Sequence, residues 1–217
     1  MHQPNWLDWA QRLQAIAQTG LHYVPHAFDQ ERYDAVKQIA AEIFAAHNGG
    51  DIAAVQAAFE MQVGHATPKI DVRGVVFRED AMLLVRENLD GGRWTLPGGW
   101  ADINEVPSEG VEREVYEETG YRTRAAKLLA VYDRRLHGHS MAMFHAYKLF
   151  FRCDLLADQP DGTHADLTSA AFNETSEARF FREEEIPADL SLGRVTPQEI
   201  KRFFEHLRQP DLPTDFD

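Results

Sequence analysis

The sequence predicts an α+β protein in which a small helical domain precedes a larger domain that mixes strands and helices. Apolar residues recur every three or four positions through the first 65 residues, which is the helical period. From residue 70 onward, short apolar runs separated by turn residues predict strands instead. With 217 residues and 44% hydrophobic content, the chain is long enough for one large domain or two small ones.

Three short helices account for the first domain, which we expect to span residues 1–65. The first helix ends at Gly20, the second ends near Asn48, and Asp51 is a candidate N-cap for the third. The apolar positions that define these helices are Leu7, Ala10, Leu13 and Ala17, then Tyr33, Val36, Ala40 and Ile43, and finally Ile52, Val55 and Phe59. We interpret the aromatic residues of this region as helix-packing residues rather than substrate contacts.

The second domain, residues 66–217, begins where Thr67 and Pro68 interrupt the helical pattern. The expected strands are residues 70–77, 82–86, 127–132, 142–155 and 178–182, with a polar loop at 158–173. Near the end of the chain, Thr196 and Glu199 form a capping box around a proline at the first helical position. A final helix is therefore predicted from this point.

Between the second and third of these strands, the sequence predicts a helix over residues 107–119. It starts with a proline, and Gly120 suits the left-handed conformation that ends a helix. Glu114, Glu117 and Glu118 lie at spacings that bring three carboxylates to one side of this helix. Like charges at such spacings destabilise a helix by a few tenths of a kcal/mol per pair, which a cation would relieve. Oxygen ligands suit a hard ion, so the pattern predicts a site for Mg²⁺ or Mn²⁺.

The spacing of the charged and glycine residues around this helix is specific. Counting from Gly99, five residues lead to Glu105 and seven more to Arg113 and Glu114, followed by Val115, Glu117, Glu118 and Gly120. This pattern resembles the signature of the Nudix hydrolase family, G-x5-E-x7-R-E-U-x-E-E-x-G-U, with Tyr121 at the last, usually aliphatic, position. The resemblance implies an α/β/α sandwich with a mixed sheet. It also implies a loop-helix-loop site that hydrolyses nucleoside diphosphates linked to another group X.

The resemblance further implies which residues carry the reaction. Water would attack one phosphorus of the diphosphate while metal ions bridge the phosphates. The candidate metal ligands are Gly99, whose backbone can approach a metal closely, and the carboxylates Glu114, Glu117 and Glu118. Nudix enzymes place the general base either on this helix or on a later loop. The candidate catalytic residues are therefore Glu114, Glu118, Glu174 and Glu177.

Three further residues are candidate substrate contacts. Arg73 and Arg86 belong to the expected hairpin beside the site and can bind phosphate through two parallel hydrogen bonds. Trp94 is a candidate face for a quaternary ammonium group such as that of choline. Nudix enzymes for ADP-ribose often carry a proline about 15 residues past the box, and positions 134–138 contain none.

A second resemblance covers nearly the whole chain. The segments WLDWAQRLQAIAQTGLHYVPHAF and GYRTRAAKLLAVYDRR are similar to those of bacterial CDP-choline pyrophosphatases and of relatives labelled ADP-ribose pyrophosphatases. This resemblance implies a homodimer assembled through the helical segment, and a substrate of the CDP-choline type that is cleaved to CMP and phosphocholine. Two alternatives stay open. One is an ADP-ribose pyrophosphatase, and the other is a non-catalytic nucleotide-binding regulator on a Nudix scaffold.

Composition argues against several other classes of protein. A formal net charge of −13 disfavours a nonspecific grip on the phosphates of nucleic acids. The single cysteine, Cys153, sits in an apolar run and is expected to be a buried structural thiol rather than a nucleophile. No segment approaches 18 consecutive apolar residues, and the first residues lack a signal-peptide pattern. We therefore expect a cytoplasmic protein with no membrane partner.

Overall fold

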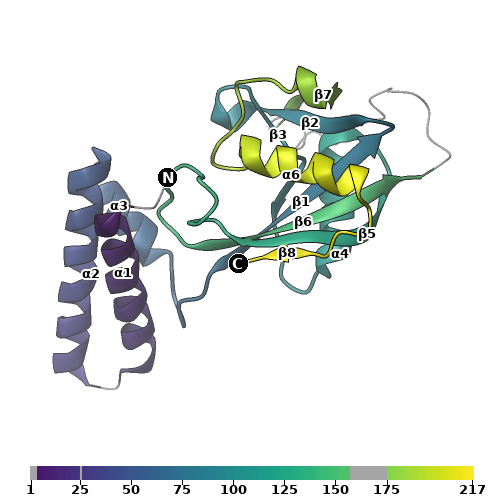
Figure 1. The fold of residues 1–217 in the computed structure, drawn as a ribbon. Helices are drawn as coiled ribbons and strands as arrows, with labels where there is room; N and C mark the ends of the chain where they lie inside the picture. Colours follow the sequence, from purple (N-terminus) through teal and green to yellow (C-terminus); the bar gives the residue numbers. More distant parts are fainter. Residues whose placement is uncertain (1–3, 25, 157–174) are drawn as a thin grey trace. The chain divides into compact units, whose positions relative to one another are not determined.

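A computed structural model of the chain describes residues 4–24, 26–156 and 175–217, and its elements are labelled in Figure 1. The contacts divide the chain into two compact units. The first unit comprises Met1–Lys69 and Met141–His145, and the second comprises Ile70–Ser140 and Ala146–Asp217. None of the described helices combines the length and apolarity that crossing a membrane requires.

The first unit contains the three predicted helices, which are α1 (Asn5–Tyr23), α2 (Ala27–Asn48) and α3 (Ile52–Glu60). Asp51 caps α3 as expected, because its side chain accepts a hydrogen bond from the backbone nitrogen of Ala53 at 3.0 Å. The helices enclose a small apolar core made of Leu7, Ala10, Ala40, Ala41, Phe44, Val55 and Phe59. Trp6 packs edge-on against Phe44 in this core.

The second unit is built on a mixed sheet, as predicted. Its elements are β1 (Lys69–Arg78), β2 (Ala81–Glu87), η1 (Asn88–Asp90), β3 (Arg93–Thr95), β4 (Gly98–Trp100), α4 (Pro107–Thr119), β5 (Thr123–Asp133), β6 (Ala146–Leu155), β7 (Thr175–Arg182), η2 (Glu183–Glu185), α6 (Pro197–Arg208) and β8 (Asp215–Phe216). The strand order is β3-β2-β1-β6-β5-β8, with β4 also paired to β1 and β7 to β2. β5 and β6 are antiparallel, whereas β5 and β8 are parallel.

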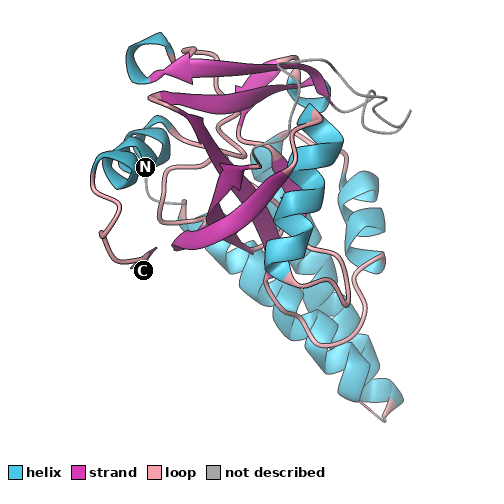
Figure 2. Cartoon of the chain, turned by 90° about the vertical axis from the view of Figure 1, so that its right-hand side faces the viewer, coloured by secondary structure: helices cyan, strands magenta, loops and turns pink. Residues whose placement is uncertain are grey.

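Helices α4 and α6 cover opposite faces of this sheet (Figures 1 and 2). On one face, Ile200, Phe203 and Phe204 of α6 pack into the larger core cluster together with Phe150 of β6. The capping box of Thr196 and Glu199 starts α6 as the sequence predicted. On the other face, α4 packs into a second cluster that includes Cys153, whose pKa burial raises to about 12. The thiol is therefore structural, as expected.

Two differences from the sequence predictions stand out. Strand β6 begins at Ala146 rather than at residue 142, because Met143 and Phe144 pack against the apolar core of the helical unit. The short strands β3, β4 and β8 were not predicted, since two or three residues carry too little periodicity to reveal a strand. The predicted polar loop at 158–173 lies outside the described residues.

Candidate active site

The candidate active site is built on α4, whose apolar side fixes its position against the sheet. Val111 and Val115 are fully buried against β1. Gly74 of β1 makes this close packing possible, because a Cβ atom at that position would collide with the side chain of Val115. The same packing places Glu114 and Glu118 beside β4.

Glu118 is a buried carboxylate held by the backbone of β4. Its Oε2 atom accepts a hydrogen bond from the Gly98 nitrogen at 3.1 Å, and its side chain is nearly inaccessible to solvent. Gly98 has φ of 137°, and a Cβ there would collide with the Val72 carbonyl, so only glycine fits. Burial raises the pKa of Glu118 to about 8. Arg73 opposes this rise and the like charge of Glu114 adds to it.

Glu114 lies beside the neighbouring glycine and is shared with Arg113. Both carboxylate oxygens of Glu114 are 3.1 Å from the point where a Cβ of Gly99 would lie. The Nη1 atom of Arg113 donates to Glu114 and to Glu117, at 3.0 Å in each case. The Nε and Nη2 atoms of Arg113 bind the two oxygens of Glu105 at 2.8 and 2.9 Å, which ties the loop to the helix.

The side chains at this site are of the chemical type that binds a divalent cation. Burial raises the pKa of Glu114 as it does that of Glu118, so a partly buried acid and a buried acid meet at a glycine backbone where a cation would stabilise their charge. Oxygen donors of this type select hard ions. Across residues 4–24, 26–156 and 175–217, no three His, Cys, Asp or Glu side chains converge as a ligand set. Arg113 instead binds the carboxylates of Glu114 and Glu117.

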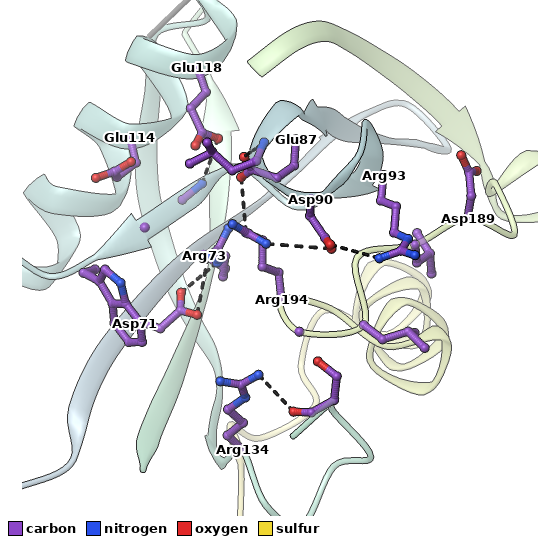
Figure 3. Close-up of a pocket in the computed structure, with 18 of the residues that line it drawn as sticks. Asp71, Arg73, Glu87, Asp90, Arg93, Glu114, Glu118, Arg134, Asp189 and Arg194 are labelled. Carbon is purple, nitrogen blue, oxygen red and sulfur yellow. Dashed lines mark hydrogen bonds and ion pairs between the residues drawn. The ribbon is translucent and has the colours of Figure 1, made fainter. Parts of the chain in front are cut away.

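A cavity of about 920 Å³ opens next to these carboxylates (Figure 3). Glu114, Glu118 and Gly99 line it. Among the described residues on its wall, Trp100 is the aromatic one. Four arginines also line the cavity: Arg73, Arg93, Arg134 and Arg194. The other carboxylates on its wall are Asp71, Glu87, Asp90 and Asp189. The cavity therefore offers guanidinium groups for an anion and carboxylates for a cation or for hydroxyl groups.

Comparison with known families identifies this architecture. A family model described as "NUDIX domain" matches residues 67–203, and one described as "UDP-X-like, N-terminal oligomerisation domain" matches residues 4–59. The chain belongs to the Nudix hydrolase family. This confirms the family resemblance and the α+β fold predicted from the sequence. Nudix hydrolases in general use divalent metal ions, in agreement with the donor set beside β4.

Three relatives are similar to this Nudix hydrolase over most or all of its length. A Bacillus subtilis (strain 168) protein named "Putative ADP-ribose pyrophosphatase YjhB" is 40% identical over 99% of this chain and 98% of its own. A crystal structure described as a UDP-X diphosphatase is 28% identical, covers all of both chains and has a TM-score of 0.59. An ADP-ribose pyrophosphatase from Streptococcus suis 89-1591 is 33% identical, with a TM-score of 0.58 over 70% of this chain and all of its own.

The structure brings some of the predicted Nudix site residues together. Glu114, Glu118, Gly99 and Arg73 line one cavity. Glu117 does not line it, since its half-exposed carboxylate is bound to Arg113.

Other predicted residues lie away from the cavity. Trp94 is buried in the core against Phe181, so it does not line the cavity as a substrate contact would. Arg86 also lies off the cavity wall, where its Nε donates to the Gly92 carbonyl at 2.8 Å. Its Nη1 faces Glu177 at 3.7 Å, and that carboxylate is likewise not on the wall. Glu174 lies outside the described residues.

Several polar residues of the cavity were missed by the sequence predictions. Asp71 accepts hydrogen bonds from Arg73 Nε at 2.7 Å and from Lys148 Nζ at 2.5 Å, and all three side chains are buried. Burial alone would raise the pKa of Asp71, but its two cationic partners hold that pKa below its usual value. The sequence signal that could have revealed Asp71 and Lys148 is the presence of a polar residue inside an apolar strand run. Arg134 and Arg194 come from loops and gave no comparable signal.

Proposed function

We propose that this chain hydrolyses the diphosphate of nucleoside diphosphates linked to a group X, using Mg²⁺ or Mn²⁺ held by Glu114 and Glu118. The observation that carries this proposal is the pairing of two carboxylates, one buried and one partly buried, with the guanidinium of Arg73 around one cavity. Carboxylates would hold the metal, and a guanidinium would bind the phosphates of the substrate. Gly99 and Glu117 are proposed as further ligands, and Glu117 would have to leave Arg113 to take that role.

The residues of the chain supply positioning and fixed charge. A bound metal ion would neutralise charge on the diphosphate and lower the pKa of the attacking water. Arg73 is held in place by Asp71 and by the Leu96 carbonyl, which accepts from its Nη1 at 3.1 Å. Its positive charge therefore stands at a fixed point of the cavity wall. The hydrogen bond from Gly98 fixes the direction of the Glu118 carboxylate in the same way.

Glu114 and Glu118 are the proposed catalytic carboxylates because they lie on the cavity wall. Glu177 is the alternative general base from the later segment. It would have to leave Arg86 and move to the cavity before it could act on a bound water. Glu174 remains a prediction, since it lies outside the described residues.

For the group X, the cavity supports a hydroxyl-bearing sugar, as in ADP-ribose, ahead of choline. Quaternary ammonium groups bind to the faces of aromatic rings. Trp100 lines the cavity as described, whereas Trp94 is buried in the core and does not. Asp90 and Asp189 can accept hydrogen bonds from sugar hydroxyls. The names of two similar proteins support the same order. CDP-choline becomes the second candidate, favoured by the more than half-exposed ring of Trp100.

A substrate panel tests this proposal. With Mg²⁺ or Mn²⁺, ADP-ribose should give AMP and ribose 5-phosphate with a higher kcat/KM than CDP-choline, a UDP-linked sugar or a nucleoside triphosphate. Products would be identified by mass spectrometry, and EDTA should abolish their formation. Efficient cleavage of CDP-choline without cleavage of ADP-ribose would favour CDP-choline as the substrate, as expected from the sequence. If the protein binds nucleotides but cleaves no substrate in the panel, the alternative of a non-catalytic nucleotide-binding regulator would be favoured.

We also propose that the helical unit assembles the chain into a homodimer. Trp9, Ile16 and Tyr23 recur every seven residues on α1, and each is more than half exposed. Side chains at this spacing share one helix face, and an exposed apolar face of this kind marks an interaction surface. The family match to an N-terminal oligomerisation domain supports this proposal. The cytoplasmic location expected from the sequence stays a prediction.

Charge placed on this face of α1 should separate the protomers. We expect the unchanged chain to have twice the monomer mass in light scattering, and Ile16→Glu to shift the mass toward that of one chain. Helical content by circular dichroism should stay the same, because the side chain of Ile16 is 55% exposed. A variant with the mass of the unchanged protein would place the interface elsewhere.

A further inference from the structure

Behind one wall of the cavity, two buried cations share a single carboxylate. Asp71 serves two cations at once, since its Oδ1 accepts from Arg73 and its Oδ2 from Lys148. Lys148 is completely buried and Arg73 is nearly so. One carboxylate balances only one of these two charges. The wall is therefore suited to an anion.

Arg134 adds a third cation to the same region. It follows β5, lines the cavity, and has Arg73, Arg194 and Asp71 among its charged neighbours. Figure 3 shows it on the side of the cavity away from Glu118, with Arg73 and Asp71 between them. Burial lowers the pKa of Arg134, and the positive charges of Arg194 and Arg73 lower it further.

The guanidinium of Arg134 has a donor without an acceptor. Its Nη2 donates to the Ser140 carbonyl at 3.0 Å, whereas its Nε is buried and has no hydrogen-bond partner within the described residues. A buried, unpaired donor on a charged group costs free energy that an incoming acceptor recovers. An anion in the cavity would be such an acceptor.

The loop that carries Arg134 is held against a second loop of the same unit. The nitrogen of Ser140 and the Nδ1 of His139 both bond the Leu192 carbonyl, at 3.1 and 3.0 Å. The Nε2 of His139 bonds Glu199 at 2.9 Å, and both of these side chains are fully buried. Arg134 therefore projects from an anchored segment. The guanidinium is thus held beside the cavity before any ligand arrives, which lowers the entropy cost of binding.

We propose that Arg134 binds an oxygen of the substrate's diphosphate, on the side of the cavity opposite the metal-binding carboxylates. This assignment rests on the proposed function and deepens it, because it names a residue that positions the phosphates. Arg73 lies between Glu118 and Arg134 and would contact the same diphosphate. The diphosphate carries the negative charge of an ADP-ribose or CDP-alcohol substrate, so it is the group that Arg73 and Arg134 on the cavity wall would select.

The kinetic test compares Arg134→Met with a matched neighbour. The side chain of Arg135 is hydrogen-bonded to both carboxylate oxygens of Asp133 and does not line the cavity, so Arg135→Met is the control. Losing a hydrogen bond to a charged group should reduce kcat/KM by about 10- to 100-fold, mainly through KM, while the control stays within about twofold. Arg134→Lys should recover part of the loss. Equal kcat/KM in Arg134→Met and Arg135→Met would overturn the proposal.

A binding measurement separates this proposal from the proposed function. Adenosine 5′-(α,β-methylene)diphosphate with Mg²⁺ carries a diphosphate analogue that cannot be hydrolysed, so its affinity by calorimetry is independent of turnover. We expect Arg134→Met to bind it about tenfold or more weakly than the Arg135 control. This result would support the assignment even if no substrate in the panel were cleaved. No binding by the unchanged protein, or equal binding by both variants, would overturn it.

Thermal melts check the fold of each variant. A role of Arg134 limited to holding its loop would lower the melting temperature of Arg134→Met and leave KM and analogue affinity unchanged, which would also overturn the assignment. If Arg134→Met does not fold, Arg134→Lys takes its place. A lysine lacks the planar fork of arginine, so a KM raised about fivefold or more supports the assignment, and a KM equal to that of the unchanged protein overturns it.

Discussion

Replacing Glu118 by glutamine is expected to reduce hydrolysis by about 10³-fold or more while the fold is kept. The substitution removes the charge of a proposed metal ligand and leaves the shape of the side chain nearly unchanged. A metal ion contributes several kcal/mol of charge stabilisation to such a reaction, which corresponds to a loss of this size. Steady-state kinetics with saturating Mg²⁺ would measure it. Glu109→Gln, on the exposed side of the same helix, is the control and should retain activity.

The same variant has a second expected result that does not depend on activity. Because burial raises the pKa of Glu118 from 4.5 to about 8, the folded, metal-free protein keeps this proton after the unfolded chain has lost it. The contribution of Glu118 to stability is therefore complete below about pH 4.5 and is lost between that pH and about 8. At about 1.4 kcal/mol per pKa unit the loss reaches a few kcal/mol. Glu118→Gln cannot ionise, so without metal it should be more stable than the unchanged protein at pH 8.

Replacing Asp71 by asparagine is expected to lower the free energy of unfolding by about 3–5 kcal/mol, because it leaves Arg73 and Lys148 buried without their shared anion. Urea unfolding would measure this loss. Asp154→Asn is the control, since Asp154 pairs with Arg152 at the surface and such pairs contribute about 0–1 kcal/mol. A loss below about 1 kcal/mol for Asp71→Asn would contradict the charge balance described for this wall.

A double variant refines this prediction. Lys148→Met removes one of the two cations, so adding it to Asp71→Asn should restore part of the lost stability. The two substitutions are in direct contact and should not be additive. Additive losses would mean that the two side chains do not interact in the folded protein.

The parts of the fold that local sequence determines were predicted well. Helix α4 starts at a proline and ends at Gly120, whose φ is 73°, as helix-end rules require. The capping box of Thr196 and Glu199 made α6 equally clear. The carboxylates of the site lie on a single helix, so their proximity follows from helical spacing alone.

The parts that depend on distant contacts were not predicted. Apolar residues recur along the whole run from Ala142 to Leu155, and nothing local shows that Phe144 packs in one unit and Phe150 in the other. Trp94 and Arg86 are register partners on β3 and β2, but periodicity does not reveal which face of those strands meets the cavity.

The cavity wall opposite α4 illustrates the same limit. Asp71 and Lys148 are separated by 77 positions in the chain and meet only because of the strand order of the sheet. Arg134 reaches the cavity from a loop, where the sequence offers no periodic pattern. Carboxylates that share one helix can be grouped from sequence, whereas a cavity wall assembled from several strands and loops needs the folded structure.

The central claim is that Glu114 and Glu118 hold the divalent ion. The most direct test is a titration of the full-length protein with Mn²⁺, in which electron paramagnetic resonance measures the free ion. We expect the unchanged protein and Glu109→Gln to bind Mn²⁺ with the same affinity, and Glu118→Gln to bind it about tenfold or more weakly. Equal affinity in Glu118→Gln and the unchanged protein would contradict the metal assignment.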